Sequence, residues 1–140
     1  MKTEFFFVLE EIPRTTAQEK GYNRRTGRYY QKKKVSDAAD LYDFMLMTNK
    51  PPRKLTGAIR VEVFFYYPVK KPHKNGEPKI TRPDGDNMVK LLLDRATKTG
   101  AFWDDDAQIS DLRIVRAYSE PSGIGMIATE IGQGGIERND

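Results

Sequence analysis

The chain has 140 residues, no cysteine, and a formal net charge of +4 from 24 Lys/Arg against 20 Asp/Glu. This length is typical of one core, so we expect a single domain over residues 1–140. Without cysteine, disulfides, zinc–thiolate sites and cysteine nucleophiles are excluded, which fits a reducing, cytoplasmic setting. Residues 1–82 carry net +9 and residues 83–140 net −5, so the basic part suits a polyanion and the acidic part a metal ion.

The N-terminal part predicts a strand, a basic loop and a helix. An apolar run predicts a buried strand over 4–10, and it is too short for a membrane span or a signal sequence. Residues 14–34 are rich in Lys and Arg, with glycines and tyrosines between them, which is typical of a loop. Ser36 is a candidate N-cap for a helix over about 37–49, because apolar residues follow it at helical spacing.

The middle of the chain predicts a central strand followed by a second basic loop. Residues 58–67 alternate β-branched and aromatic residues with polar ones, which favours a strand. Residues 68–83 contain several lysines and prolines, and Asn75-Gly76 is a candidate turn tip.

A helix and two strands are expected in the C-terminal part. The helix runs from residue 86 or 87 to about 98, and Gly100 is placed to cap its C-terminus. Strands are expected over 108–118 and 124–131, and the tail over 132–140 is expected to fray. The order strand, helix, strand, helix, strand, strand predicts an α+β domain, with two helices packed on one face of a small mixed sheet.

Aspartates gather in two clusters, Asp84 with Asp86 and the run 104–106. Carboxylates held close together repel one another, and a divalent cation bound between them offsets this electrostatic repulsion. Asp84-Gly85-Asp86 lies where a loop becomes a helix, so Asp86 can cap the first turn while Gly85 lets the backbone bend. We expect the second cluster to return beside the helix N-terminus and to form one metal-binding cleft with the first.

This arrangement suits metal-assisted phosphoryl transfer, in which oxygen ligands hold Mg²⁺ or Mn²⁺ and Lys90 neutralises charge on a phosphodiester. Simpler explanations stay open for each residue. Asp84 and Asp86 can be a helix cap and a solvated turn, and the run 104–106 can be an exposed hairpin tip. Lys90 can pair with Asp86 or Asp94 on the helix surface. Asp94 lies near the same helix face and is left out of the core site.

Three segments together resemble the RusA family of Holliday junction resolvases. The family pattern has a paired aspartate motif with a lysine four residues later, a Leu/Phe-Asp-Ala pair, and an Asp-Asp-(Ala/Ser)-Gln-Val box. The matching segments are Arg82-Pro83-Asp84-Gly85-Asp86-Asn87-Met88-Val89-Lys90, Leu93-Asp94, and Phe102-Trp103-Asp104-Asp105-Asp106-Ala107-Gln108-Ile109. The resemblance is close over 82–109 and covers about three quarters of the chain more loosely.

The resemblance implies the site residues. The metal ligands are expected to be Asp84, Asp86 and Asp106, and the catalytic set adds Lys90 and Asp105. Asp104 departs from the family pattern, because many members have a non-acidic residue at this position. With three aspartates in a row, the alignment of the second cluster with the family motif is therefore open by one residue. Arg95 also departs, because a small residue usually follows the aspartate at that position.

The resemblance also implies the activity. It predicts a homodimeric hydrolase that binds a four-way DNA junction and makes paired nicks with Mg²⁺, for which Mn²⁺ substitutes, without a small-molecule cofactor or a membrane. Members of the family are often carried by phages. The two basic loops are expected to hold the phosphate backbone. The residues predicted to bind DNA are Lys20, Arg24, Arg25, Arg28, Lys32, Lys33, Lys70, Lys71 and Arg82.

Two other functions remain open at this stage. One is a branched-DNA-binding protein that does not cleave. The other is a nucleotide-sugar transferase, which also uses paired aspartates, although the chain is short for a second, acceptor-binding domain. His73 has no convincing partner in the sequence for a triad or a metal site.

Overall fold

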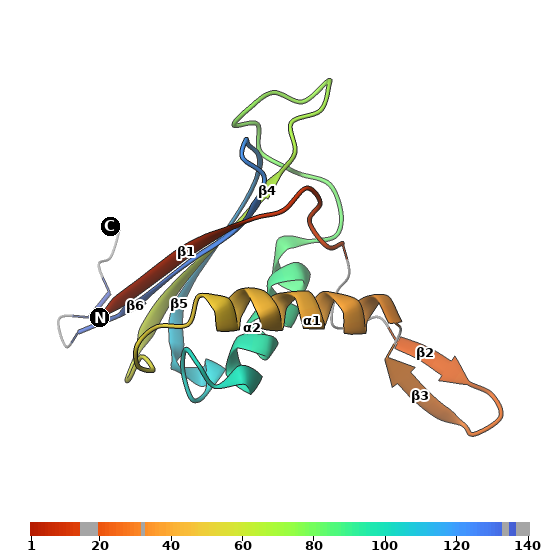
Figure 1. Ribbon diagram of the computed structural model, residues 1–140, viewed down its shortest axis with the longest axis horizontal. Coiled ribbons are helices and arrows are strands. Elements are labelled where there is room, and N and C mark those ends of the chain that lie inside the picture. Colours follow the sequence, from red (N-terminus) through yellow and green to blue (C-terminus); the bar gives the residue numbers. More distant parts are fainter. Residues whose placement is uncertain (15–19, 32, 133–134, 137–140) are drawn as a thin grey trace.

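The computed structural model of the protein describes residues 1–14, 20–31, 33–132 and 135–136 (Figure 1). The main sheet of this part of the chain is formed by β1 (Lys2–Val8), β4 (Ile59–Tyr67), β5 (Ile109–Tyr118) and β6 (Gly123–Glu130). The other elements are a hairpin of β2 (Lys20–Asn23) and β3 (Arg28–Gln31), the helices α1 (Lys33–Thr48) and α2 (Gly85–Thr99), and a short 3₁₀ helix, η1 (Asp106–Gln108).

The main sheet is mixed and has the strand order β1-β6-β4-β5. β6 lies antiparallel to both β1 and β4, whereas β4 and β5 are parallel. Parallel neighbours need a crossover rather than a tight turn, and α2 lies in the connection between β4 and β5. The start of α2 is therefore placed beyond the end of a central strand, next to the sheet.

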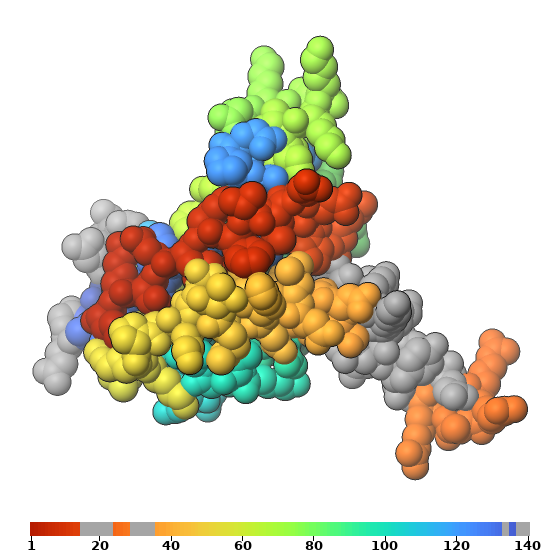
Figure 2. All heavy atoms as spheres, in the orientation of Figure 1, coloured from red at the N-terminus to blue at the C-terminus, as the bar shows by residue number. Residues whose placement is uncertain are grey.

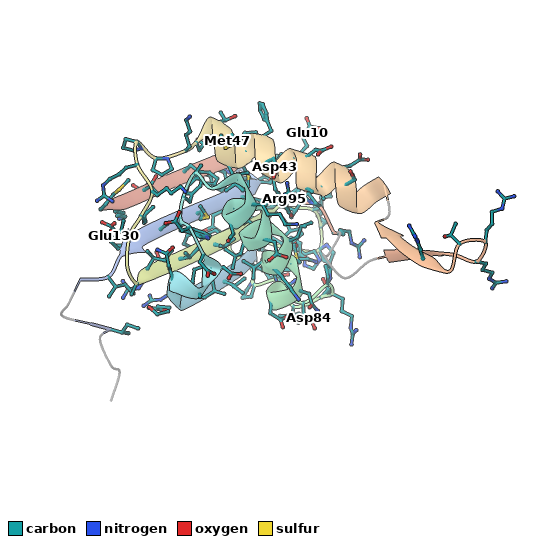
Figure 3. The ribbon with its side chains drawn as sticks, turned by 90° about the horizontal axis from the view of Figure 1, so that it is seen from below. Glu10, Asp43, Met47, Asp84, Arg95 and Glu130 are labelled. Atoms are coloured by element: carbon teal, nitrogen blue, oxygen red, sulfur yellow. The ribbon has the colours of Figure 1, made fainter. Side chains whose placement is uncertain are left out.

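One face of the sheet is covered by both helices. Along β4, every second side chain from Ile59 to Tyr67 is buried, and the side chains between them are only half-buried. The buried face packs against α1 and α2, which lie side by side on the sheet (Figure 3). The predicted α+β arrangement, with two helices on one face of a mixed sheet, is confirmed.

The N-terminal region differs from the sequence prediction in three ways. The strand predicted as buried over 4–10 is β1, which runs from Lys2 to Val8 and whose side chains alternate between exposed and half-buried. Residues 20–31, predicted as part of a loop, form the antiparallel β2–β3 hairpin, in which Gly27 adopts a φ of 68° at the turn. The prediction of Ser36 as an N-cap is wrong, because α1 already begins at Lys33. Lysine and serine side chains are accepted in the first turn of a helix. The helix therefore begins before the apolar residues from which it was predicted.

At the C-terminal end of α2 the prediction is confirmed. Gly100 follows the helix in the left-handed conformation, with φ 67°, and its N–H donates to the Thr97 carbonyl at 3.1 Å. The frayed tail expected over 132–140 lies mostly outside the described residues. Within the described part of the chain, no helix has both the length and the apolar character needed to cross a membrane.

Arg95 joins the two helices. Its guanidinium donates to both carboxylate oxygens of Asp43 on α1, with N–O distances of 2.8 and 2.7 Å, and the two side chains meet between the helices (Figure 3). Bidentate pairs of this kind fix orientation as well as position. The arginine that departs from the family pattern is thus explained by packing of α2 on α1.

Glu130, at the end of β6, ties three segments together. Its carboxylate accepts hydrogen bonds from the N-terminal amine at 2.9 Å, from Arg53 at 3.0 and 3.1 Å, and from the Thr56 N–H at 2.7 Å. The hydrogen bonds from Arg53, and then those from Thr56 and the N-terminus, hold the pKa of Glu130 far below its usual range. The contacts anchor the loop before β4 to the end of the sheet.

We therefore expect Glu130→Gln to lower the midpoint of thermal unfolding at pH 7. A carboxylate with a depressed folded-state pKa stabilises the fold above its unfolded pKa, near 4.5, and that stability is lost as pH falls towards the folded pKa. The difference between wild type and variant should accordingly shrink as the pH is lowered from about 4.5 to 2.5. Glu4→Gln, at an exposed residue 3.9 Å from Lys2, is the matched control. An unchanged difference across this range would contradict the role assigned to the charge.

Candidate active site

The first acidic cluster lies at the N-terminus of α2. Asp84 is the N-cap residue and has an extended backbone, with φ −66° and ψ 148°, but its side chain makes no capping hydrogen bond. The prediction that Asp86 caps the helix is wrong, since Asp86 lies within the first turn. Both carboxylates are exposed, and Lys90 is exposed one turn further along the helix. Figure 3 shows Asp84 at the free end of α2.

Arg116 of β5 fixes the loop that delivers Asp84. Its Nη1 donates to the carbonyl of Thr81 at 3.0 Å and to that of Pro83 at 2.6 Å. A Cβ on Gly85 would lie 3.3 Å from the Arg116 Nε. Gly85 is therefore favoured here because the helix start approaches β5 closely, and its φ is not in the left-handed region that the predicted bend would need. The sheet itself thus sets where the first cluster stands.

The second acidic cluster is built around Gln108. The Gln108 Oε1 accepts from the N–H groups of Asp104 and Asp105 at 3.0 and 3.1 Å, and its Nε2 donates to the Gly57 carbonyl at 3.0 Å. The Asp105 carboxylate in turn accepts from the Ala107 N–H at 2.9 Å, which completes a capping box around η1. One glutamine side chain thus holds the cluster in shape and ties it to the loop before β4.

The three aspartates of the second cluster are not equivalent. Asp104 pairs with Lys54, with an N–O distance of 2.7 Å, and so is turned towards the loop before β4. Asp105 caps η1. The pKa of Asp106 is raised, first by burial, then by its hydrogen bond with Asp105, and then by the charges of Asp105 and Asp94. Asp106 therefore faces other carboxylates.

Asp94 is the neighbour that the sequence prediction left out. It follows Asp86 by two turns and Lys90 by one turn, so these three side chains share one face of α2. Eight residues of helix span about 12 Å, which places Asp106 beside the later turns of α2 rather than beside its N-terminus. The sequence contains a signal for the role of Asp94. Asp86, Lys90 and Asp94 are spaced four residues apart, and this spacing places them on one face of a helix.

The oxygen donors of Asp84, Asp86 and Asp106 suit a hard divalent cation such as Mg²⁺. Among the residues that the structure describes, no three Asp, Glu or His side chains stand close enough to one another to hold a metal ion. Asp84 and Asp86 stand together at the helix start, and Asp105 and Asp106 stand together at η1. The set of three metal ligands stays a prediction.

The basic residues fall on two projecting parts of the molecule. Arg24, Arg25 and Arg28 are exposed on the β2–β3 hairpin, which stands clear of the body (Figure 2). Lys70, Lys71 and Arg82 are exposed in the loop between β4 and α2. Of the remaining predicted residues, Lys20 begins β2 and Lys33 begins α1, whereas Lys32 lies outside the described part.

Comparison with known proteins identifies the family. Residues 11–126 match the family described as Endodeoxyribonuclease RusA. A protein of Lactococcus phage r1t named crossover junction endodeoxyribonuclease rusA is 32% identical over 135 residues, covering 94% of this chain and 100% of its own. A protein of the same name from Enterobacteria phage HK97 is 28% identical over 129 residues, covering 91% of this chain and 96% of its own. The matched region contains both acidic clusters and the strands and helix that position them, and the chain belongs to the RusA endodeoxyribonuclease family.

Proposed function

We propose that the protein is a metal-dependent, structure-selective DNA endonuclease that resolves four-way (Holliday) junctions by paired nicks. The observation that carries this proposal is the likeness, over the full length of the relative, to a protein named crossover junction endodeoxyribonuclease. The acidic clusters support it, because phosphodiester hydrolysis needs oxygen ligands for a cation, and the chain offers them on rigid elements beside the sheet.

The proposed roles follow the placement of the side chains. Asp84, Asp86 and Asp106 would hold Mg²⁺ or Mn²⁺, which supplies an activated water and neutralises negative charge on the scissile phosphate. Lys90 lies on the same helix face as Asp86, where its ammonium can bind a phosphate oxygen. Asp105 keeps η1 in shape through its capping bond, and its carboxylate helps to raise the pKa of the neighbouring Asp106.

Branched DNA is held, in this proposal, by the two projecting basic parts. The arginines of the β2–β3 hairpin and three cations of the loop before α2, Lys70, Lys71 and Arg82, lie on separate parts of the domain. Separate basic extensions can contact two arms of a junction, whereas one flat patch contacts a single duplex. Phosphate contacts of this kind make affinity fall steeply with salt concentration.

We also propose that the protein acts as a homodimer. Paired nicks require two active sites, and the described part of one chain offers a single region in which two acidic clusters lie near a common helix. A two-fold axis would place one site at each of two phosphates related by the symmetry of the junction. The molar mass in solution, measured by light scattering with and without junction DNA, tests this part of the proposal.

The function is tested by cleavage of synthetic four-way junctions with end-labelled strands in Mg²⁺ or Mn²⁺. Symmetric paired nicks on both a mobile and a fixed junction are expected. Single, scattered nicks would instead indicate a general nuclease, and no cleavage under any of these conditions would refute the nuclease proposal.

A non-cleaving branched-DNA-binding protein is the second candidate, and the separation of Asp106 from the helix start favours it. Tight junction binding without cleavage would identify it.

Gln108 provides a prediction for this activity. We expect Gln108→Ala to lower the rate of junction cleavage about 10- to 100-fold, because it releases the backbone that positions Asp105 and Asp106. Junction affinity should stay near the wild-type value, since the Gln108 amide is already engaged by the backbone of Leu55, Gly57, Asp104 and Asp105. Single-turnover cleavage and a gel-shift titration without divalent metal separate these two quantities.

Ser110→Ala is the matched control for Gln108, because Ser110 is an exposed residue of β5 two positions away. It should cleave at the wild-type rate. Equal losses in the two variants, or a Gln108→Ala protein as active as wild type, would show that the glutamine does not position the second cluster.

A further inference from the structure

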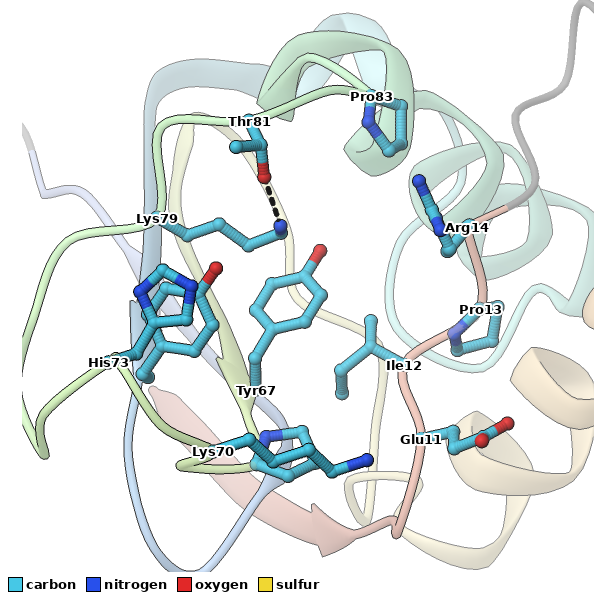
Figure 4. A pocket seen from close by; sticks show the side chains of 12 residues that line it. Glu11, Ile12, Pro13, Arg14, Tyr67, Lys70, His73, Lys79, Thr81 and Pro83 are labelled. Atoms are coloured by element: carbon cyan, nitrogen blue, oxygen red, sulfur yellow. Dashed lines mark hydrogen bonds between the residues drawn. The ribbon is translucent and has the colours of Figure 1, made fainter.

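A cavity of about 740 Å³ lies beside the start of α2. It is enclosed by the segment after β1, the ends of β4 and β5, and the loop that leads into the helix (Figure 4). This volume is in the range of sites that hold a whole small molecule, of the size of a nucleotide. We call it the Tyr67 pocket, after the residue at its centre, and its wall includes Ile12, Arg14, Lys70, Lys79 and Pro83.

The charged groups of the pocket are mainly cationic. Arg14, Lys70 and Lys79 enter from three different sides (Figure 4), and Glu11 is the one carboxylate among the residues that line it. The Lys79 ammonium lies 4.7 Å from the centroid of the Tyr67 ring and donates to the Thr81 hydroxyl. Cations that converge on one space from separate elements favour an anionic ligand.

The floor of the pocket is aromatic and apolar. The Tyr67 ring stands in the middle with Ile12 beside it (Figure 4). On another wall, the His73 ring stacks on Tyr118, with centroids 3.9 Å apart and planes inclined by only 7°. Burial raises the pKa of Tyr67, while the charges of Arg116 and Arg14 oppose that rise, so the phenol is neutral. The floor therefore offers a ligand a small uncharged surface, since Tyr67 is 9% and Ile12 6% exposed.

The pocket adjoins the first acidic cluster. Thr81 and Pro83 belong to its wall, and Asp84 is the next residue. The Tyr67 hydroxyl donates to the Met88 Sδ at 3.2 Å, which joins the pocket floor to the first turns of α2. Arg116 holds the shared segment in place through the Thr81 and Pro83 carbonyls. A ligand in the pocket is thus separated from Asp84 by one residue of wall.

We propose that the Tyr67 pocket binds one unpaired nucleotide of the DNA, next to the phosphate that is cut. The base packs on the floor formed by Tyr67 and Ile12, and its phosphate pairs with Arg14, Lys70 and Lys79. A duplex offers a protein mainly phosphate and sugar, because its bases are stacked and paired, so an aromatic floor among cations indicates a single strand. This proposal rests on the proposed function and adds the class of nucleotide that the site selects.

Binding of short, labelled, single-stranded DNA without divalent metal tests the pocket. The probes are a thymidine pentamer and an abasic chain with the same number of phosphates, followed by fluorescence anisotropy. We expect the pentamer to bind the wild type at least about fivefold more tightly than the abasic chain, because stacking of one base contributes that much or more. Arg14→Ala and Lys79→Ala should each weaken pentamer binding about tenfold, since each removes a charge-assisted contact.

Lys74→Ala is the matched control, because Lys74 is exposed on the same loop and does not line the pocket. It should change pentamer affinity by less than about twofold, a screened surface charge contributing little. Circular dichroism checks that each variant is folded. Equal affinity of the wild type for the two probes, or equal losses in the Lys74 and Lys79 variants, would overturn the pocket proposal.

The outcomes separate this proposal from the proposed function. A protein that cuts junctions but binds the two probes equally retains the nuclease function and has no nucleotide pocket. A protein that prefers the pentamer through Arg14 and Lys79 but never cuts DNA retains the pocket and loses the nuclease assignment.

Discussion

Asp86→Asn is expected to reduce junction cleavage on the order of 10²- to 10³-fold, while junction binding stays equal to that of the wild type or becomes tighter. The substitution keeps the shape of the side chain but removes an anionic oxygen proposed to hold the metal ion. It also removes a negative charge from the helix start, where the DNA phosphate is expected to lie. Single-turnover cleavage in Mg²⁺ and a gel-shift titration in EDTA measure the two effects separately.

Asp104→Asn is the matched control for this prediction. Asp104 is an exposed aspartate of the other cluster, paired with Lys54 rather than facing Asp106, so its loss should leave cleavage close to the wild-type rate. If the Asp104 variant lost activity and Asp106→Asn kept it, the register of the second cluster would be shifted by one residue. A fully active Asp86→Asn protein would remove Asp86 from the set of metal ligands.

The elements with a strong periodic signal were predictable from the sequence. β4 alternates over nine residues between buried and half-buried side chains, and this alternation is already visible in its pattern of β-branched and aromatic residues. α2 has apolar residues at helical spacing and is followed by a glycine, so its C-terminal cap Gly100 was predicted correctly, and the helix end expected near residue 98 lies at Thr99. Local chemistry alone determines these features.

The β2–β3 hairpin was missed because its strands are short and its composition is that of a loop. Each of its strands has only four residues, and pairing depends on the turn at Gly27 bringing them together. Arginines and lysines surround this turn, which also is the composition of a solvated loop. Charge identified the segment as a surface for a polyanion but carried no information on whether the backbone pairs.

The acidic residues were found from the sequence, and their mutual arrangement was not. Asp84 and Asp86 were predicted at a helix start because capping is a local property. The approach of Asp106 to Asp94, and the bonds of Gln108 to Gly57, join residues brought together by the crossover from β4 to β5. Such contacts depend on the order of strands in the sheet. A single sequence therefore shows which residues are candidate metal ligands, but not which of them lie close together in the fold.

Trp103→Ala is expected to destabilise the fold by about 3–5 kcal/mol. Trp103 is fully buried, its ring meets Phe102 edge-on at 6.1 Å, and its Nε1 donates to the Thr97 hydroxyl at 2.8 Å. Truncation leaves a cavity under the link between α2 and η1 and removes that hydrogen bond. A domain of this size is stable by about 5–15 kcal/mol in total, so the variant should unfold at a much lower urea concentration.

Two further variants separate the causes of this loss. Trp103→Phe keeps most of the ring but removes the indole N–H, so it should retain more stability than Trp103→Ala. Ile80→Ala removes apolar atoms at a residue that is 89% exposed, and it should shift the free energy of unfolding by less than about 0.5 kcal/mol. Because Trp103 directly precedes the second acidic cluster, folded Trp103→Phe should also cleave more slowly than wild type. Wild-type stability of Trp103→Ala would mean that the link is held by the Gln108 hydrogen bonds alone.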